Sequence, residues 1–436
     1  MAKLMQVLSK TVRRFSSALY VTGDKAQSHF VVLTPYIDFD EIIKNKNDLL
    51  KSIQARKLKI DLDKIERRWN FFKMIDDHRT VLEFTKTEIH NLINKLKQEG
   101  EEQNKSDIEK LLVHVKLVKD DLKNVKEYSY GLEENANLGV LSLPNLLHHK
   151  TPLDSHTIIH EFLEQPKPIS ENHIQIGKSL NLIEYTNPTL CYLKSDAALF
   201  EFAITNYFQI TLLNQGFTQF SNADFARSLV VEGCGTDYLD KNKIFTLDGS
   251  NNEINRLHVV GGASLYSFMA YFAKHSIQST LLPLKFFTLG RKYSPGSGPD
   301  LLNLSQNTVG QIFVATSDNS NEIFDILIEQ IREIYEPLNY HLRLVYAPAA
   351  SLKVGESLKV SIEMFSNYSG KYVEIGYLSL YGDYISKRLL FTHGKERTFI
   401  NVISGEILNV QRFLACALEN SYNEKPLLPS LLQKYI

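Results

Sequence analysis

The chain has 436 residues, enough for two domains that each bury a hydrophobic core. Its formal net charge of -1 excludes nucleic-acid binding through overall charge and leaves only a local basic surface for that role. Its cysteines, Cys191, Cys234 and Cys416, lie far apart without a CxxC motif, so we expect neither a zinc site nor a disulfide framework.

The first 23 residues have the composition of a targeting segment. They contain four basic residues, Lys3, Lys10, Arg13 and Arg14, and no acidic residue. A helix here would place several leucine and valine side chains near one face, which is typical of a mitochondrial presequence. We therefore predict a presequence at residues 1–23 and a protein of the mitochondrial matrix; the alternative is a basic helix of the mature fold. No apolar run approaches the roughly 18 residues that cross a bilayer, so we expect no membrane contact.

Residues 24–150 are predicted to form a helical arm. From about residue 38 to 138 the chain has little Gly or Pro and is rich in Lys, Glu, Leu and Ile, which favours long helices. A coiled-coil seam is predicted at Ile108, Leu111, Val115, Val118, Leu122 and Val125. A rougher apolar stripe precedes it at Ile65, Trp69, Phe72, Ile89, Leu92 and Leu96. With a polar turn between them, the two helices should pair antiparallel.

The polar face of the arm is mildly basic. Between Arg56 and Lys97 there are 11 Lys or Arg against 7 Asp or Glu. Charged faces of coiled coils are usually just solvated, but a few phosphate contacts can also supply most of the affinity for RNA. The candidate RNA-binding residues are Arg67, Arg68, Lys73, Arg79, Lys110, Lys116, Lys119 and Lys123.

Residues 151–436 are predicted to form an α+β domain. Short β-rich runs at 342–347, 358–365 and 371–380 alternate with helical stretches, which indicates an antiparallel sheet. Several histidines lie near the domain boundary, but scattered histidines are more often structural, and we predict no metal site.

A series of blocks in this domain resembles the seryl-tRNA synthetases in order and spacing, and the resemblance covers nearly all of the chain after the presequence. The blocks are YLKSDAALFEFAITNYF, NQGFTQFSNADFARSLVVEGCG, VVGGASLYSFMAYFAKHSI, LPLKFFTLGRKYSP, VEIGYLSLYGDYISKR and a helix ending in ALEN. The resemblance implies the class II aminoacyl-tRNA synthetase fold, an antiparallel-sheet catalytic-type domain preceded by an antiparallel helical-hairpin arm. In that family the arm grips the long variable arm of serine tRNA, and chains dimerise through the catalytic domain.

The resemblance also implies that the chemistry is lost. Forming an aminoacyl-adenylate requires cations for the ATP phosphates, carboxylates for Mg²⁺, an aromatic face for adenine and polar groups for the amino acid. The family's threonine and glutamate at the serine substrate are replaced by Gly262 and Ser264. Its ATP-clamping arginine and glutamate are replaced by Ser294 and Gly296. A further arginine, the adenine-stacking phenylalanine and an acid are replaced by Asn303, Asn307 and Gln311.

Some family positions survive. Glu363 and Glu374 match acids near the ATP metal, and Arg412 matches the arginine of the last motif, while Glu406 and Ile407 would crowd the nucleotide. One lost charge-assisted hydrogen bond costs about 1.5–3 kcal/mol, so three losses would remove roughly 3–6 orders of magnitude in rate. We predict no ligase activity and no bound cofactor or metal.

The degenerate blocks further resemble a non-catalytic mitochondrial paralogue of the family. We therefore predict a mitochondrial protein that binds tRNA of the serine type and partners the active mitochondrial seryl-tRNA synthetase, as a heterodimer or as a homodimer. Gln219 and Ala223 stand where the family favours prolines near the subunit contact. Two alternatives remain: a divergent but active serine–tRNA ligase, and a regulatory scaffold that does not bind RNA.

Overall fold

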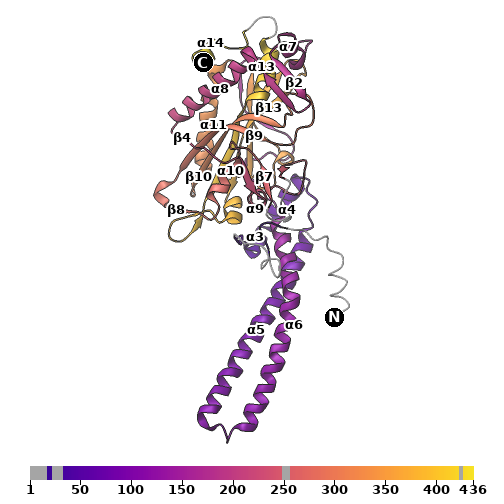
Figure 1. Ribbon diagram of the computed structural model, residues 1–436, viewed down its shortest axis with the longest axis vertical. Helices are drawn as coiled ribbons and strands as arrows, with labels where there is room; N and C mark the ends of the chain where they lie inside the picture. The colour runs from indigo at the N-terminus through magenta and orange to yellow at the C-terminus, as the bar shows by residue number, and fades with distance from the viewer. Residues whose placement is uncertain (1–16, 22–32, 248–255, 422–425) are drawn as a thin grey trace.

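A computed structural model describes residues 17–21, 33–247, 256–421 and 426–436. It consists of a long two-helix arm that extends from one end of a mixed α/β body (Figure 1). Among the described helices, none combines the length and the apolar composition needed to cross a bilayer. The predicted α+β class and the predicted helical hairpin are both confirmed.

The arm is formed by α5 (Leu62–Gly100) and α6 (Lys105–Leu141), which run antiparallel. Two short helices, α3 (Phe39–Lys44) and α4 (Lys46–Ala55), lie at its base. The side chain of Asp61 caps the start of α5 by accepting a hydrogen bond of 2.9 Å from the Lys64 backbone N–H.

The predicted seam of α6 is confirmed, because Ile108, Val115 and Leu122 are buried and the other three positions are half-buried. On α5 the prediction for Leu92 is wrong. Its side chain is 49% exposed, whereas that of the neighbouring Ile93 is 7% exposed and packs in the seam. Adjacent residues on a helix point about 100° apart, so a displacement of one residue moves a side chain from the core to solvent.

A buried arginine joins the base of the arm to the body. Arg56 donates hydrogen bonds to the backbone carbonyls of Lys353, at 2.6 Å, and of Glu356 in the body. It also donates to the Asn145 carbonyl, at 3.3 Å, in the segment that follows the arm. Burial lowers the pKa of Arg56 to about 10, so the guanidinium stays charged at neutral pH. Charge-assisted hydrogen bonds thus connect the two parts of the molecule.

The body is built on an eight-stranded sheet that is antiparallel except for one edge pair, β4 with β9. The strands in spatial order are β1 (Thr157–Phe162), β11 (Leu342–Tyr346), β12 (Leu358–Ser366), β13 (Lys371–Gly382), β16 (Asn401–Asn409), β10 (Gln306–Thr316), β9 (Leu284–Tyr293) and β4 (Thr218–Gln219). The β-rich runs predicted from the sequence are β11, β12 and β13. Three small sheets comprise β5 (Phe225–Arg227) with β7 (Leu257–Val259) and β6 (Phe245–Thr246), β2 (Ile183–Asn187) with β3 (Leu190–Leu193), and β8 (Ser276–Ile277) with β14 (Thr392–His393) and β15 (Thr398–Phe399).

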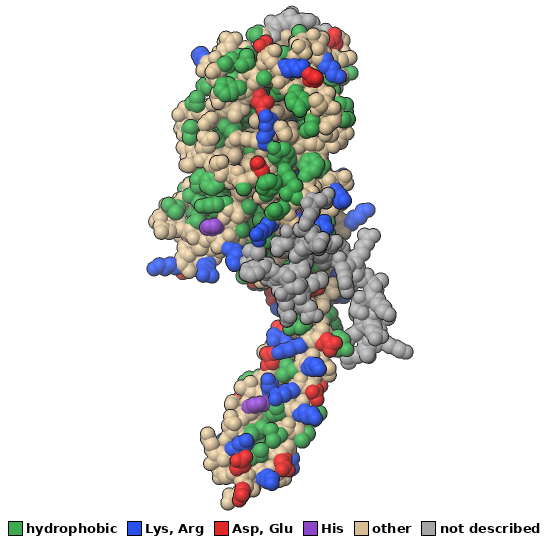
Figure 2. All heavy atoms as spheres, viewed as in Figure 1, with side chains coloured by type: hydrophobic (Ala, Val, Ile, Leu, Met, Phe, Trp, Pro, Cys, Tyr) green, Lys and Arg blue, Asp and Glu red, His purple; other side chains and the backbone are tan. Residues whose placement is uncertain are grey.

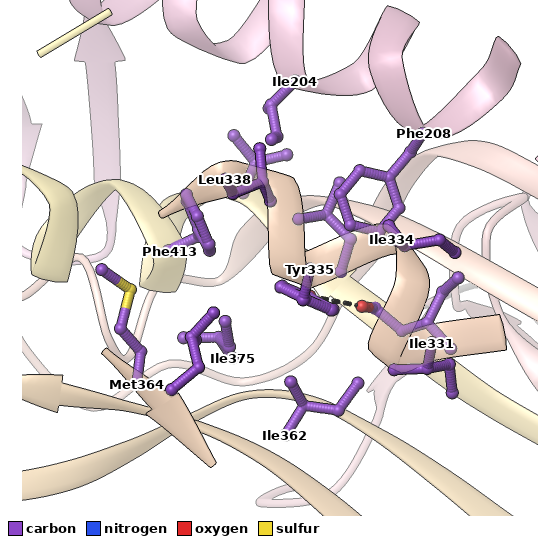
Figure 3. Close-up of a cluster of buried hydrophobic side chains, with 14 of the residues drawn as sticks. Ile204, Phe208, Ile331, Ile334, Tyr335, Leu338, Ile362, Met364, Ile375 and Phe413 are labelled. Carbon is purple, nitrogen blue, oxygen red and sulfur yellow. Dashed lines mark hydrogen bonds between the residues drawn. The ribbon is translucent and has the colours of Figure 1, made fainter. Parts of the chain in front are cut away.

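Three long helices make the main core with this sheet: α8 (Ser195–Asn214), α11 (Ser320–Tyr335) and α13 (Val410–Ser421). Figure 3 shows Tyr335 at the centre of this core, among Phe208, Phe413 and aliphatic side chains from the strands. The Tyr335 hydroxyl donates to the backbone carbonyl of Ile407 at 2.7 Å, so its buried polar atom is satisfied. The remaining short helices are α7 (His173–Ser179), α9 (Ser228–Gly233), α10 (Leu265–Phe272), α12 (Tyr384–Leu389) and α14 (Ser430–Gln433).

The predicted presequence lies outside the described residues except at 17–21. Ser17, Leu19 and Tyr20 in this short stretch are buried against the body and the arm. The presequence at residues 1–23 stays a prediction, and its described part, residues 17–21, packs against the folded protein.

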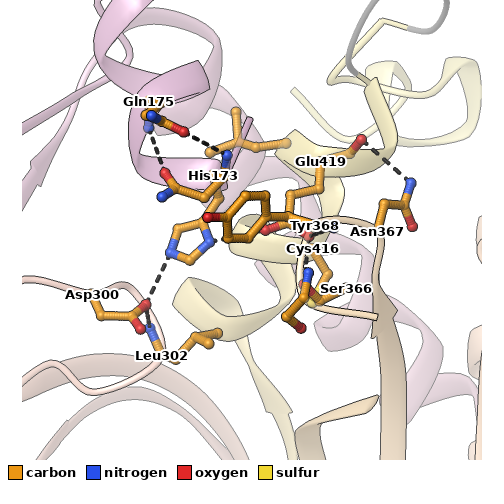
Figure 4. Close-up of polar contacts among 12 residues, drawn as sticks. His173, Gln175, Asp300, Leu302, Ser366, Asn367, Tyr368, Cys416 and Glu419 are labelled. Atoms are coloured by element: carbon orange, nitrogen blue, oxygen red, sulfur yellow. Dashed lines mark hydrogen bonds and ion pairs between the residues drawn. The ribbon is translucent and has the colours of Figure 1, made fainter. Parts of the chain in front are cut away.

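A buried histidine fixes the loop that follows β9. His173 Nε2 lies 2.9 Å from Asp300 Oδ1, and its Nδ1 lies 3.2 Å from Glu419 Oε1 of α13 (Figure 4). The second oxygen of Glu419 accepts bonds from Ser366 Oγ at 2.7 Å and from the Tyr368 N–H at 3.2 Å. Burial by itself would lower the pKa of His173, but the hydrogen bonds with the two carboxylates outweigh it and raise the pKa to about 9.

This network predicts a pH-dependent contribution to stability. A raised folded-state pKa means that the contribution is fully present below about pH 6.5 and is lost as the pH rises through about 9. Relative to wild type, His173→Gln should lower the free energy of unfolding by about 3 kcal/mol at pH 6, with the difference shrinking towards pH 9.5. Chemical denaturation across this range measures it, with exposed His156→Gln as the control. A difference that is constant with pH would contradict a charged His173.

Candidate functional site

A polar cleft of about 230 Å³ opens where β9, β10, β13 and β16 meet the start of α13. It brings together six of the ten candidate site positions: Ser294, Gly296, Asn303, Asn307, Glu374 and Arg412. It also contains Lys292, Lys353, Tyr377, Glu406 and Asn409. The other four candidate positions, Gly262, Ser264, Gln311 and Glu363, do not line it.

An ion pair lies in this cleft, between Lys292 at the end of β9 and Glu406 in β16. The side chains are 24% and 7% exposed, respectively, so the pair is largely removed from water. Asn409 Nδ2 donates to the second carboxylate oxygen of Glu406 at 2.8 Å. Burial would raise the pKa of Glu406, but the Lys292 ammonium outweighs it and lowers that pKa. The two charges therefore neutralise each other inside the cleft.

The guanidinium of Arg412 is engaged by the protein's own backbone. Its Nε donates to the carbonyl of Leu302 at 3.0 Å, and its Nη1 donates to the carbonyl of Glu374 at 3.2 Å. The Arg412 N–H in turn donates to Asn409 Oδ1 at 3.1 Å, which fixes the first turn of α13. Two of the donor nitrogens that could meet an anion are thus committed to main-chain oxygens.

The two surviving acids are also engaged. One carboxylate oxygen of Glu374 accepts bonds from Lys359 Nζ at 2.8 Å and from Ser361 Oγ at 2.7 Å. Burial would raise the pKa of Glu374, but Lys359 outweighs it and lowers that pKa. Glu363 pairs with Arg343, whose Nε and Nη2 each lie 2.7 Å from the same carboxylate oxygen. Across residues 17–21, 33–247, 256–421 and 426–436, no group of three or more His, Cys, Asp or Glu side chains is placed to hold a metal ion.

The loop after β9 folds closely on itself. The Ser294 N–H donates to the Ser305 carbonyl at 3.0 Å, and the Gly296 N–H donates to Ser305 Oγ at 3.2 Å. A Cβ atom added at Gly296 would meet the carbonyl oxygen of Asn303 and lie 2.8 Å from the Ser305 nitrogen. Any side chain at position 296 would therefore displace the backbone of this loop.

Aromatic surface and a further cation come from two residues that the sequence did not single out. Lys353 Nζ lies 5.0 Å from the ring centroid of Tyr377, and Lys359 Nζ lies 4.9 Å from it. Lys292 was also not identified from the sequence as a cleft residue, although the alternation of side chains along the strand could have indicated it. Arg291 points away towards Glu201 and Thr308, so the next side chain in the strand points into the cleft.

The remaining candidates have structural contacts outside the cleft. Ser264 caps α10 by accepting from the Ser267 N–H, and its hydroxyl donates to the Gly261 carbonyl at 2.9 Å. The Gly262 N–H donates to Asp224 Oδ1 at 2.7 Å. Gln311 Nε2 donates to Ser404 Oγ at 2.8 Å, between two central strands.

The basic residues of the arm differ in their availability. Lys110 pairs with Asp107, Arg79 with Asp76 and Glu83, and Lys73 with Asp40. By contrast, five residues form no ion pair with any residue of the described ranges: Arg67, Arg68, Lys116, Lys119 and Lys123. All of these but Arg68 are exposed.

Lys116, Lys119 and Lys123 share one face of α6, because residues three, four and seven apart lie on one side of a helix. Lys126 continues this face and pairs across the arm with Glu83 of α5, at 3.2 Å. Figure 2 shows basic side chains along the arm, interleaved with acidic and apolar ones. The arm therefore offers a short row of cations in place of a uniformly basic surface.

The chain is similar to serine–tRNA ligases and to a ligase-like protein over nearly its whole length. The chain is 29% identical over 449 residues to the Drosophila melanogaster serine–tRNA synthetase-like protein Slimp, covering 98% of this chain and 96% of that protein. It is 24% identical over 461 residues to the mitochondrial serine–tRNA ligase of Mus musculus, covering 98% and 87% of the two chains. No protein-family model matches the chain.

Solved structures agree on the fold. The seryl-tRNA synthetase of Pyrococcus horikoshii, solved with ATP, superposes with a TM-score of 0.79 at 17% identity, covering 92% of this chain and 98% of that chain. The cytoplasmic serine–tRNA ligase of Naegleria fowleri, solved with AMP, superposes with a TM-score of 0.76 at 18% identity, covering 90% and 94%. The chain therefore has the class II fold of the seryl-tRNA synthetases and is a seryl-tRNA synthetase-like protein along nearly its whole length.

Proposed function

We propose that this chain is a non-catalytic seryl-tRNA synthetase-like protein that binds tRNA of the serine type without binding ATP or aminoacylating the tRNA. The observation that carries the proposal is the state of Arg412. This arginine matches the last motif of the family, yet it donates to the carbonyls of Leu302 and Glu374 in a cleft that also holds the Lys292–Glu406 pair.

The cleft does not fit a magnesium-bound triphosphate. Two of the five N–H donors of Arg412 are engaged by the carbonyls of Leu302 and Glu374, so fewer remain to meet phosphates, and releasing either carbonyl would cost about 1–3 kcal/mol. Binding Mg²⁺ through Glu374 would displace Lys359 and Ser361 from its carboxylate. The Glu406 carboxylate, 7% exposed, would meet the negative charge of the nucleotide.

The cleft also lacks the positions that recognise the amino acid in the family. Ser264, at the place of the family's glutamate, is 2% exposed and hydrogen-bonds within its own turn. The loop at Gly296 has no space for the clamp glutamate. Several independent requirements of adenylate formation thus fail together.

The first prediction concerns ATP. We expect isothermal titration of the full chain with Mg-ATP to show no binding at micromolar concentration, and millimolar Mg-ATP to leave the melting temperature unchanged. A ligand at 100 times its Kd would stabilise the fold by about 2.7 kcal/mol, which a thermal scan detects readily. An active seryl-tRNA synthetase is the positive control. Micromolar binding, or pyrophosphate exchange with serine, would instead support the divergent-ligase alternative.

The proposed tRNA-binding surface is the row of Lys116, Lys119 and Lys123. These side chains are exposed and form no ion pair with a described residue, so no protein contact has to break when a phosphate approaches. They span about 10 Å along α6, at 1.5 Å per residue. A row of this length can follow the backbone of a helical RNA stem, whose phosphates supply most of the affinity.

The second prediction tests this row. Lys116→Glu, Lys119→Glu and Lys123→Glu together should weaken binding of serine tRNA by about tenfold or more, because three phosphate contacts become repulsive. The slope of log affinity against log salt concentration should also become less negative by about 2–3, because about one unit of slope is lost for each phosphate contact. Filter binding or fluorescence anisotropy at several salt concentrations measures both.

The matched control keeps the same change of net charge but reverses lysines that already pair with acids, namely Lys51, Lys95 and Lys97. It should affect RNA binding less than the first triple variant. If both triple variants lose the same RNA affinity, the loss comes from the change in net charge and not from this row of lysines. Unchanged affinity in both would favour the scaffold that does not bind RNA.

We further propose a mitochondrial matrix location and a partnership with the active mitochondrial seryl-tRNA synthetase. The basic, acid-free sequence of residues 1–23 and the similarity to mitochondrial ligases support the location. The exposed Leu199, Phe202, Ile210 and Leu213 of α8 offer apolar area for a subunit contact. Co-expression followed by native mass spectrometry distinguishes a heterodimer from a homodimer.

A further inference from the structure

A short N-terminal stretch inside the predicted presequence lies in the interior of the folded protein. Ser17 is 4% exposed, Leu19 is 2% exposed and Tyr20 is 8% exposed. Leu19 belongs to the second core of the body, which also contains Val231, Cys234 and Phe272. A segment that is removed after import has no reason to fill a core, so its burial needs another explanation.

The stretch is held by a buried carboxylate. One oxygen of Glu232 in α9 accepts from Ser17 Oγ at 2.7 Å. The other accepts from the backbone N–H groups of Ala18, at 2.6 Å, and Leu19, at 3.1 Å. Ser17 Oγ in turn accepts from the N–H groups of Leu19 and Tyr20, at 3.1 Å and 3.0 Å, so the stretch forms a tight turn around the carboxylate. Without these residues Glu232 would lose three donors.

The same turn reaches the arm. The hydroxyl of Tyr20 donates to Glu133 Oε1 of α6, so the body and the arm are bridged within four residues. Arg388 of α12 makes a second bridge nearby, because its Nη2 donates to the Leu141 carbonyl at the end of α6, at 3.3 Å. Ser17–Tyr20 thus forms a strap between α9 and α6, at the junction on which the orientation of the arm depends.

We propose that the cut that removes the basic N-terminal sequence falls ahead of Ser17, so that the strap Ser17–Tyr20 is retained in the mature protein. The proposal rests on the mitochondrial location argued above. The step is hydrolysis of one peptide bond by a matrix endopeptidase, in which water adds across the C–N bond and leaves a carboxylate on the released peptide and an amine on the mature chain. Removal of all 23 predicted residues would instead leave Glu232 buried without its donors.

Import of the full-length precursor into isolated mitochondria, followed by intact-mass and N-terminal analysis, tests the cut. We expect a shortened product that still contains Ser17. A product that begins at Ala18 or later would overturn the proposal and leave the mitochondrial location standing. Failure of import would overturn the location, and the cut with it.

The strap itself is tested in the full-length protein. Leu19→Asp and Glu232→Ala should each lower the melting temperature by about 5 °C or more, because one places a charge in the core and the other removes the acceptor. Ser17→Ala, a milder change, should lower it by less, and remains measurable where the first two prevent folding. Leu239→Asp, at a position 44% exposed, is the control and should change little. Unchanged melting in all three strap variants would overturn a structural role for the retained residues.

Discussion

The charged side chains of the cleft form contacts with one another and with the main chain, and any ligand of the cleft has to compete with these contacts. Lys292 and Glu406 neutralise each other with little exposure to water, and Arg412 is bound by two main-chain carbonyls. Breaking a buried pair leaves an uncompensated charge, which is strongly destabilising. A ligand would therefore have to overcome contacts that the fold itself uses. These charged groups of the cleft contact one another and the main chain.

The arm presents the opposite situation. Exposed charges on a helix stabilise it little, so Lys116, Lys119 and Lys123 remain available to an outside partner. The arm stays in position because Arg56, Arg388 and the Ser17–Tyr20 strap connect its base to the body through buried hydrogen bonds. The buried contacts lie at the joint and in the body, whereas the lysines of this row, which form no ion pair with a described residue, lie along the arm.

The class II fold of this chain is stabilised mainly by residues outside the cleft. The main core is formed by α8, α11 and α13 against the sheet, around side chains such as Tyr335 and Phe413 that do not enter the cleft. The His173 network fixes the loop after β9 from outside the cleft, through Asp300 and Glu419. Fold and chemistry therefore depend on different residues, and one can persist when the other is altered.

The sequence by itself determined the helical arm, the coiled-coil seam of α6, the antiparallel α+β body and the six candidate positions that meet in the cleft. These follow from local periodicity and from the order of the family-like blocks. The tertiary structure decided the rest. Whether Leu92 or Ile93 enters the seam depends on how α5 packs on α6. Arg412 is engaged by residues 110 and 38 positions away in the chain. Ser17 is bound by a glutamate 215 positions away. Hydrogen bonds between such distant residues leave no trace in a local pattern, because their geometry exists only once the chain has folded.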